Sequence, residues 1–266
     1  MRQARRLTRR NVRLAERRFL VEGPQAVREA FSVPECVVDV FVTSPALARY
    51  CDIAAAAAST SVPVHLCDET AVAALAGSVT PQGVVAVCRY VDVPLTSALG
   101  PDSALVAVAA HVREPGNAGS IVRCADAAGA AAVVFAGSGV DPYNDKAVRA
   151  SAGSIFHLPL VVAMTVPDAV EALQARGFRI LAADATATTS LDAMLDSGAL
   201  AGRVAWVFGN EAWGIPDAER AAADEVVAVP IYGRAESLNV ATAAAVCLYA
   251  TARAQRAGAA VPPLSS

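Results

Sequence analysis

From residue 104 to about residue 254, short segments rich in Val, Ala, Ile and Leu alternate with segments of helical periodicity. Strands that are apolar along their whole length are buried on both faces, and helices between them connect parallel neighbours. This alternation therefore predicts an α/β fold in which a parallel sheet is covered by helices on both faces. The expected strands are 104–110, 131–135, 179–183, 204–208 and 226–230, with an extended segment at 155–161, and the expected helices are 119–128, 144–151, 167–176, 191–197 and 237–254.

The first ninety or so residues predict a smaller α/β unit of their own. We expect helices at 11–31, 45–58 and 69–76 and strands at 37–43, 62–66 and 84–90. The segment 92–103 contains two prolines and a glycine, which favours a linker. The predicted organisation is an N-terminal domain at 1–95, a linker at 96–103, a second domain at 104–256 and a flexible tail at 257–266.

The composition excludes several classes of protein. Hydrophobic residues make up 55% of the 266 residues, but the longest uncharged stretches contain Ser, Asn and Thr and fall short of the roughly 18 apolar residues of a membrane span. No Cys-x-x-Cys pair occurs and the three histidines lie far apart, so we expect neither a metal site nor disulfides. All six cysteines are expected to be small core residues: Cys36, Cys51, Cys67, Cys88, Cys124 and Cys247.

A basic run at the N-terminus contrasts with the net charge of −3. Eight of the 22 basic residues lie in the first 18 positions, with Glu16 as the only acid among them. Such a run is typical of a nucleic-acid contact, a solvated helix face or a mitochondrial presequence. Nucleic-acid contact is favoured, because the run continues into Phe19-Leu-Val-Glu-Gly23 without a linker. The expected contacts are Arg9, Arg10, Arg13, Arg17 and Arg18.

Polar segments follow three of the predicted strands in the second domain. They are Asn117-Ala-Gly-Ser-Ile-Val-Arg123, then Phe208-Gly-Asn-Glu211, then Val229-Pro-Ile231 followed by Ser237-Leu-Asn239. Open parallel sheets bind ligands at the carboxyl ends of their strands, so three such segments predict one site built from several loops. No Gly-x-Gly-x-x-Gly or Gly-x-x-x-x-Gly-Lys pattern is present, which disfavours the usual nucleotide-binding interpretations.

Each segment also has a purely structural interpretation. Asn117 is a typical helix cap, a cap is an equally good interpretation of Glu211 just past a buried strand, and Ser237 is expected to cap a helix that has Asn239 in its first turn. Gly209 would let a ligand approach the backbone. Arg123 lies four residues after Gly119 on a mostly apolar helix, where an arginine is costly without a partner.

Taken in order, Asn-x-Gly-x-x-x-Arg, Gly-Asn-Glu and Pro-Ile with Ser-Leu-Asn resemble the three motifs of the SpoU family of RNA ribose 2′-O-methyltransferases, in the SPOUT superfamily. The N-terminal Phe19-Leu-Val-Glu-Gly23-Pro-Gln-Ala-Val-Arg-Glu-Ala30, with Gln82-Gly83, resembles the substrate-binding domain often fused to them. The resemblance covers almost the whole chain. One departure is Ala212-Trp213, where small residues often follow the Glu.

The resemblance implies a second domain with a deep trefoil knot, a homodimer, and S-adenosylmethionine held in a bent form by the knotted loops. The implied cofactor-binding residues are Gly209, Val229, Ile231 and Leu238, and the implied catalytic residues are Asn117, Arg123, Glu211, Ser237 and Asn239. Arg113 joins the expected RNA contacts. The implied substrate is ribosomal RNA, with RNA of the large ribosomal subunit favoured. The implied location is the cytoplasm, and no metal is expected. A transfer RNA methyltransferase, a catalytically silent RNA-binding protein of the same fold, and an unrelated α/β enzyme are the alternatives.

The implied mechanism gives Arg123 a role in proton removal that the high pKa of a guanidinium makes difficult. The family role of this arginine is to bring about deprotonation of the ribose 2′-hydroxyl, yet a guanidinium keeps its proton up to a pH above about 12. Our hypothesis is that Arg123 stabilises the developing alkoxide and holds a neighbouring phosphate. Ser237 and Asn239 would orient it, and Glu211 would fix the loop.

Overall fold

The computed structural model describes residues 1–257, so nearly all of the predicted tail lies outside the described residues. The chain forms two compact units, and each draws on separated stretches of sequence. The first unit contains Met1–Asp92, Glu114–Arg123 and Val140–Pro159, and the second contains 93–113, 124–139 and 160–257.

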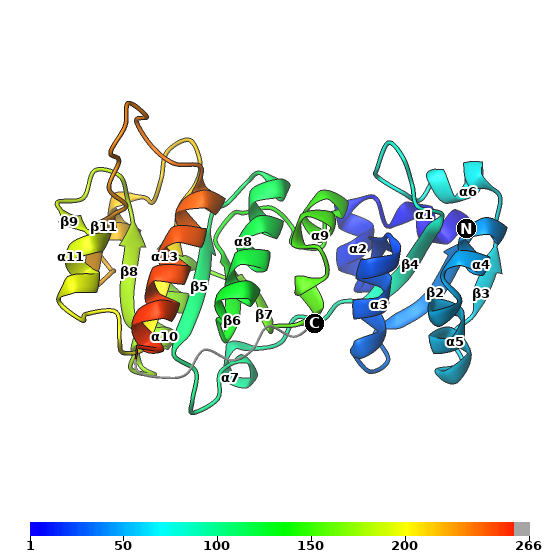
Figure 1. The fold of residues 1–266 in the computed structure, drawn as a ribbon, viewed down its shortest axis with the longest axis horizontal. Helices are drawn as coiled ribbons and strands as arrows, with labels where there is room; N and C mark the ends of the chain where they lie inside the picture. Colours follow the sequence, from blue (N-terminus) through cyan, green and yellow to red (C-terminus); the bar gives the residue numbers. More distant parts are fainter. Residues whose placement is uncertain (258–266) are drawn as a thin grey trace. The chain divides into compact units, whose positions relative to one another are not determined.

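The second unit is built on a seven-stranded sheet in the order β7-β6-β5-β10-β8-β11-β9 (Figure 1). Every pairing in it is parallel, as the alternation of strands and helices predicted. The strands are β5 (Leu105–Ala110), β6 (Ala132–Ala136), β7 (Leu160–Met164), β8 (Arg179–Ala183), β9 (Thr189–Ser190), β10 (Val204–Phe208) and β11 (Glu225–Ala228). Strands β8 and β10 have the predicted bounds.

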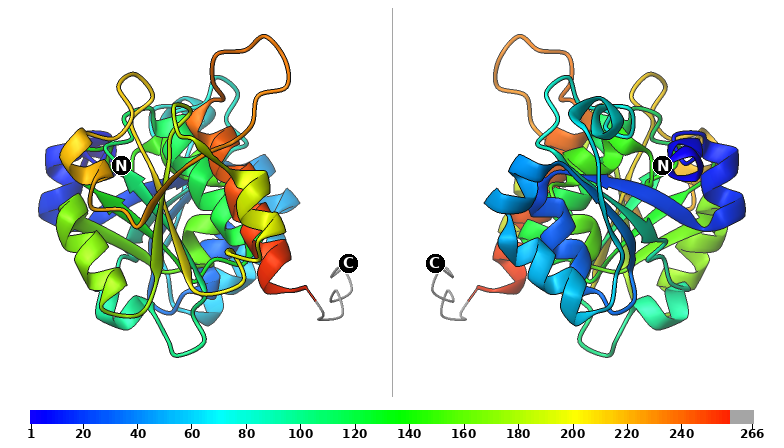
Figure 2. Two further views of the ribbon diagram at one scale, coloured as in Figure 1. Left: turned by 90° about the vertical axis from the view of Figure 1, so that its left-hand side faces the viewer. Right: turned by 90° about the vertical axis from the view of Figure 1, so that its right-hand side faces the viewer.

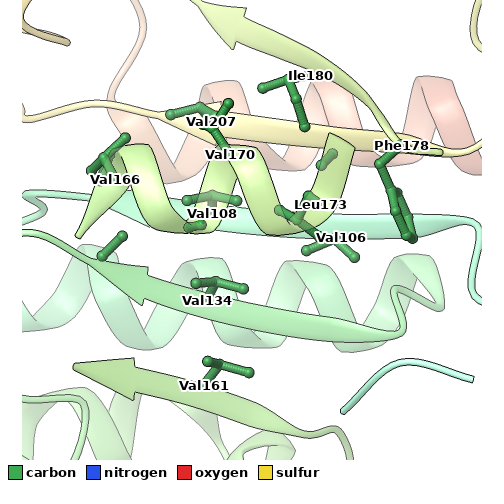
Figure 3. Packing of buried hydrophobic residues seen from close by; sticks show 14 of the residues in the cluster. Val106, Val108, Val134, Val161, Val166, Val170, Leu173, Phe178, Ile180 and Val207 are labelled. Atoms are coloured by element: carbon green, nitrogen blue, oxygen red, sulfur yellow. The ribbon is translucent and has the colours of Figure 1, made fainter. Parts of the chain in front are cut away.

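Helices cover both faces of this sheet. On one face, α10 (Val166–Gln174) packs on β8 and β6, and α7 (Leu95–Ala98) packs on β7. Figure 3 shows alternate valines of the central strands meeting α10. On the opposite face, α13 (Val240–Gln255) packs on β10 and β5 and lies beside α11 (Leu191–Asp196) (Figure 2). The chain therefore returns from β11, near one edge of the sheet, to cover its centre.

Buried Trp206 anchors α13 to the sheet. The indole Nε1 donates a hydrogen bond of 2.8 Å to the hydroxyl of Thr251, which is itself fully buried. Burying a polar group in this way is tolerated because both partners are satisfied. The contact fixes the axial position of α13, and thereby of the loop that precedes it.

The first unit contains a four-stranded sheet in the order β1-β4-β2-β3. Strand β4 is antiparallel to β1 and β2, and β3 is parallel to β2. Its elements from the N-terminal part of the chain are α1 (Arg2–Arg6), α2 (Arg10–Glu16), β1 (Arg18–Glu22), α3 (Pro24–Ser32), β2 (Val37–Val42), α4 (Ser44–Arg49), α5 (Cys51–Ser59), β3 (Val64–Leu66), α6 (Glu69–Ala73) and β4 (Val84–Arg89).

The single helix predicted over 11–31 is wrong. The chain leaves the helical conformation at Arg17, which has a left-handed φ of 50°, and then forms β1. Phe19, Leu20 and Val21 are all buried there, and the aromatic Phe19 and the β-branched Val21 suit a strand. Gly23, with φ of 92°, and Pro24 then start α3. The sequence prediction overlooked these two breaks.

Residues 140–159 pack within the first unit, although they lie beyond the predicted linker. They form α9 (Asp145–Ser151) and a 3-10 turn at Ser154–Phe156, where the sequence predicted an extended segment from 155 onward. The ring of Tyr143 lies 4.7 Å from that of Phe19 on β1, and Arg149 forms an ion pair with Glu22 at 3.3 Å. The core of this unit is therefore completed from the second half of the chain.

The cysteines are divided between core and surface. Cys36, Cys88 and Cys247 are buried, as predicted. Cys51 is exposed and Cys67 and Cys124 are partly buried, so the prediction that all six are core residues is wrong. Cys51 is the first residue of α5 and points away from the apolar face that contains Ile53 and Ala57.

Candidate functional site

A pocket of about 630 Å³ opens at the carboxyl ends of β8, β10 and β11. Its walls come from the loops that follow these three strands and from the start of α13. All of these segments belong to the second unit. The pocket lies where parallel α/β sheets bind ligands, and its volume is within the usual range for small-molecule sites.

Seven of the nine predicted catalytic and cofactor-binding residues line this pocket. They include all four predicted cofactor-binding residues and three of the five predicted catalytic residues: Gly209, Val229, Ile231, Leu238, Glu211, Ser237 and Asn239. Asn117 and Arg123 lie on the part of α8 (Pro115–Ala128) that belongs to the first unit, and they are not among the lining residues. The structure thus brings together the second and third polar segments.

Gly209 is required by the packing of its own loop. A Cβ atom there would lie 2.5 Å from the carbonyl carbon of Gly214 and 2.6 Å from a side-chain carbon of Ile215. The loop closes on itself through two backbone hydrogen bonds of 2.8 and 2.9 Å between Asn210 and Gly214. Close packing of the loop on itself is thus one reason for this glycine, and close approach of a ligand, the reason predicted from the sequence, stays a prediction.

Asn239, not Ser237, caps α13. Its side-chain oxygen accepts hydrogen bonds from the backbone N–H groups of Ala241, at 2.9 Å, and Thr242, at 3.4 Å. The helix begins at Val240, three residues later than predicted. Ser237 is exposed in the irregular loop before the helix. Asparagine is as good a cap as serine, so the sequence offered two caps and the wrong one was chosen.

Helix α8 begins four residues earlier than predicted, at Pro115. Proline is favoured at the first helical position because it lacks the N–H that would be unpaired there, and this signal was missed. Arg123 is exposed and has no hydrogen bond or ion pair to any described residue. The predicted cost of an arginine on an apolar helix is avoided, because the side chain lies on the solvent side.

Glu211 links two loops at the carboxyl ends of neighbouring strands. Its Oε2 atom accepts a hydrogen bond of 3.3 Å from the backbone N–H of Arg113, which follows β5. The side-chain amide of Asn210 donates to the carbonyl of His111 at 2.9 Å. The Asn-Glu pair of the second segment thus holds the chain that leaves β5.

An acidic and basic pair also lines the pocket, and the sequence analysis did not select it. Asp184 accepts hydrogen bonds from the backbone and hydroxyl of Thr186 at 2.8 and 2.7 Å, and from Arg220 at 3.4 Å. Partial burial acts to raise the pKa of the Asp184 carboxyl, but these bonds outweigh it and lower that pKa below its ordinary value. Asp184 is therefore ionised at neutral pH. The available signal was its place directly after β8.

The predicted RNA-contacting arginines have different environments. Arg13 is 3% exposed; its guanidinium bonds Asp141 at 2.7 Å and the carbonyls of Leu7 and Thr8 at 2.9 Å. Arg13 is therefore unavailable for RNA, contrary to the prediction. Arg17 is exposed but pairs with both oxygens of Asp92 and lies over the Tyr90 ring.

The remaining predicted contacts are accessible in varying degree. Arg9, Arg10 and Arg113 are exposed and Arg18 is partly buried. No helix in the described part of the chain is long and apolar enough to span a membrane. Within residues 1–257, no group of three or more His, Cys, Asp or Glu side chains is arranged to hold a metal ion.

The parallel sheet and the loop-built pocket at its strand ends define an α/β protein with a small-molecule site, and comparison with known proteins identifies its family. Residues 104–249 match the SpoU rRNA Methylase family, and residues 20–92 match the family described as RNA 2′-O ribose methyltransferase substrate binding.

Relatives of known name or structure match along most of the chain. The chain is 33% identical over 231 residues to the 23S rRNA (guanosine(2553)-2′-O)-methyltransferase RlmP of Bacillus subtilis (strain 168), covering 87% of each. An AdoMet-bound rRNA methyltransferase from Sinorhizobium meliloti has a TM-score of 0.83 at 27% identity, covering 98% of this chain and 95% of that one. The SpoU methyltransferase AviRb from Streptomyces viridochromogenes has a TM-score of 0.83 at 27% identity, covering 97% of each.

The chain belongs to the SpoU rRNA methylase family. It is an S-adenosylmethionine-dependent RNA 2′-O-methyltransferase with an N-terminal substrate-binding domain.

Proposed function

We propose that this enzyme methylates a ribose 2′-hydroxyl in 23S ribosomal RNA. The observation that carries the proposal is the pocket, because seven of the residues predicted from the three motifs line it. The name of the Bacillus relative, which specifies 23S rRNA, supports the choice of substrate. A cytoplasmic location follows from that substrate.

The pocket residues fit the cofactor. Val229, Ile231 and Leu238 offer apolar surface for a flat adenosine, whereas the ionised Asp184 and the guanidinium of Arg220 offer opposite charges for an amino-acid tail. We propose that these residues, with Gly209, hold S-adenosylmethionine. When bound, it supplies a methyl group on a positively charged sulfur, which is already activated for transfer.

The protein's task is then to align the ribose and to stabilise the oxygen that attacks. We propose that the guanidinium of Arg123 donates hydrogen bonds to the 2′-oxygen while the hydroxyl proton passes to solvent water, and that it also donates to a neighbouring phosphate. Its exposure and its freedom from partners among the described residues leave its donors available for RNA. Asn117, Ser237 and Asn239 are proposed to orient the ribose and Arg123, and Glu211 to hold the loop after β5.

The Arg123→Lys variant tests this assignment. Lysine keeps the positive charge but loses the planar fork of donors. We expect RNA affinity within about twofold of the wild type and methyl transfer reduced about 10²-fold, the usual effect of removing one donor to a developing oxyanion. The measurement is transfer of labelled methyl groups to 23S rRNA, followed by mapping of 2′-O-methyl sites. Near-normal turnover would contradict the role of Arg123; wild-type activity on tRNA but not on 23S rRNA would contradict the substrate.

Three further features are proposed for the whole enzyme. A deep trefoil knot is supported by the path of the chain, which leaves β11 near one edge of the sheet and then packs α13 on the central strands β10 and β5. A homodimer is supported by exposed apolar side chains on α13, Val246 at 39% and Tyr249 at 53%. The division at 1–95, 96–103 and 104–256 is proposed as a division between two sequence families, and the two family matches support it; the compact units follow it only in part, because the first also includes 114–123 and 140–159. Sedimentation of the wild type and of Tyr249→Glu tests the dimer, which the charge should weaken.

A further inference from the structure

Trp213 is an exposed aromatic side chain at the rim of the cofactor pocket. The chain has two tryptophans: Trp206 is 0% exposed, whereas Trp213 is 46% exposed. Trp213 follows Glu211 by two residues and lines the pocket. Exposing half of an indole in water is unfavourable, and a position beside a substrate site suggests a ligand for its open face.

The loop that carries Trp213 is held in one conformation. Its two ends are joined by the backbone hydrogen bonds between Asn210 and Gly214, and Gly214 turns the chain with a φ of 70°. Inside the loop, the buried side chain of Asn210 accepts from the N–H of Ala212 at 2.9 Å. The tryptophan is therefore presented on a closed turn, which reduces the entropy lost when a ligand binds to it.

The inner side of the indole rests on His111. The two rings lie 5.3 Å apart with an angle of 52° between their planes. The His111 ring is itself fixed, because Nδ1 accepts from the N–H of Ser138 at 3.0 Å and Nε2 lies 3.0 Å from Glu219. It also fills the space beside Gly137, where a Cβ atom would lie 2.3 Å from the ring. Trp213 thus has a rigid support on one side and solvent on the other.

A cationic residue, Arg113, lies on the loop next to the one that bears Trp213. Glu211 hydrogen-bonds the backbone of Arg113, so the loops bearing Arg113 and Trp213 are adjacent. The Arg113 side chain is exposed and has no partner among the described residues. An aromatic face and a free cation on adjacent loops suit a nucleotide, which has a flat base and an anionic phosphate, better than an apolar protein surface.

We propose that Trp213 is a stacking platform for an unpaired base of the RNA substrate, and that Arg113 contacts a phosphate beside that base. The inference rests on the proposed function, since it assumes an RNA substrate. It assigns the base contact to the rim of the cofactor pocket in the second unit.

The first experiment uses the fluorescence of the wild-type protein. Single-stranded nonamers of adenylate and uridylate are the probes, and Trp213→Phe supplies the background of buried Trp206. We expect the oligonucleotides to quench wild-type emission and to leave the emission of Trp213→Phe unchanged. Absence of quenching at RNA concentrations that saturate binding would overturn the proposal, as would equal quenching in the wild type and Trp213→Phe.

The second experiment separates stacking from packing. Trp213→Leu keeps apolar bulk without a π face, and Trp213→Phe keeps the face. RNA affinity should fall about 5- to 150-fold in Trp213→Leu, the range for one base–aromatic stack, and much less in Trp213→Phe. Affinity for S-adenosylmethionine, measured by calorimetry, should stay within about twofold in both. Equal RNA affinity for wild type and Trp213→Leu would overturn the proposal, and so would a loss confined to cofactor affinity.

Arg113→Ala tests the phosphate contact. Its RNA affinity should fall on all sequences alike, and the slope of log affinity against log salt should decrease by about 1. An unchanged slope would contradict the proposed contact between Arg113 and a phosphate. Methylation of 23S rRNA by the wild type is assayed in parallel: activity without any effect of Trp213 contradicts the platform alone, whereas quenching without activity contradicts the proposed function alone.

Discussion

The side chain of Asn239 has two roles, one as a helix cap and one implied in catalysis. Its oxygen caps α13 through Ala241 and Thr242, and the motif resemblance also places it in the catalytic group. We expect Asn239→Ala to lower the free energy of unfolding by about 1 kcal/mol, the usual cost of a lost cap, and Asn239→Asp to retain it. Urea denaturation measures both. Ser237→Ala is the matched control, because Ser237 is exposed and does not cap α13, and its stability should be unchanged.

The two asparagine variants then separate structure from chemistry. If Asn239→Asp is stable but transfers methyl groups slowly, the amide has a role beyond the cap. If both variants are as stable as the wild type, the cap contributes nothing measurable and the explanation for the start of α13 fails.

Arg13 is a structural residue within an arginine-rich segment. Removing one partner of a buried ion pair leaves the other charge unpaired, so Arg13→Ala should lower the free energy of unfolding by about 3–5 kcal/mol. Arg9→Ala, at an exposed position, should change it by less than about 0.5 kcal/mol. Denaturation and RNA binding are measured for both. Native-like stability with weakened RNA binding in Arg13→Ala would return Arg13 to the RNA-contacting group.

The role of Arg13 was beyond the reach of the sequence. Its partner Asp141 lies 128 positions away, and nothing in the local pattern distinguishes Arg13 from Arg9 or Arg10. The same limit applies to Asp184 and Arg220, which meet only because the loop after β8 and α12 (Asp217–Arg220) share one wall of the pocket. The order of the motifs was enough to identify the pocket residues, whereas tertiary packing determines which arginines form ion pairs within the protein.

At the scale of elements, the loop from Gly209 to Ile215 is the most constrained part of the pocket wall. In Gly209→Ala the new methyl group would collide with the backbone of Gly214, so the loop must move. Overpacking of this kind costs about 1–3 kcal/mol, and we expect affinity for S-adenosylmethionine to fall about tenfold or more. Calorimetry measures it. Gly233→Ala is the control from the loop before α13, because nothing lies within 4 Å of its Cβ position; equal affinities for the two variants would contradict this account.

Elements were predictable where the pattern was strong. The strands β8 and β10 were predicted residue for residue, because each is a short apolar run with clear breaks on both sides. β1 was lost in a predicted helix, because the apolar residues on either side of it also fit a helical period. The irregular loop before α13 has no hydrophobic periodicity, so the residue that caps α13 could be identified only from the hydrogen bonds in the structure.

At the scale of the whole molecule, the two units are interleaved in the sequence. The first unit includes 114–123 and 140–159, so a fragment ending at the predicted linker would lack part of its core. Phe19 is fully buried, with Tyr143 at 4.7 Å and Phe156 at 6.1 Å between ring centres, and both partners lie beyond residue 95. Removing large aromatic side chains from a core costs about 3–5 kcal/mol, a large share of the stability of a small domain.

We therefore expect the fragment 1–95 to unfold at lower urea concentration than the first unit does in the intact chain, and to bind a hydrophobic dye. Urea unfolding is monitored by the NMR signals of the N-terminal strands, and dye binding is measured by fluorescence. The full chain with Tyr143→Ala is the matched control, because it removes one of the missing aromatic contacts without cutting the chain; it should lie between the wild type and the fragment. A fragment as stable as the intact unit would mean that 140–159 packs on a core already complete, and the predicted boundary at 96–103 would then be a true folding boundary.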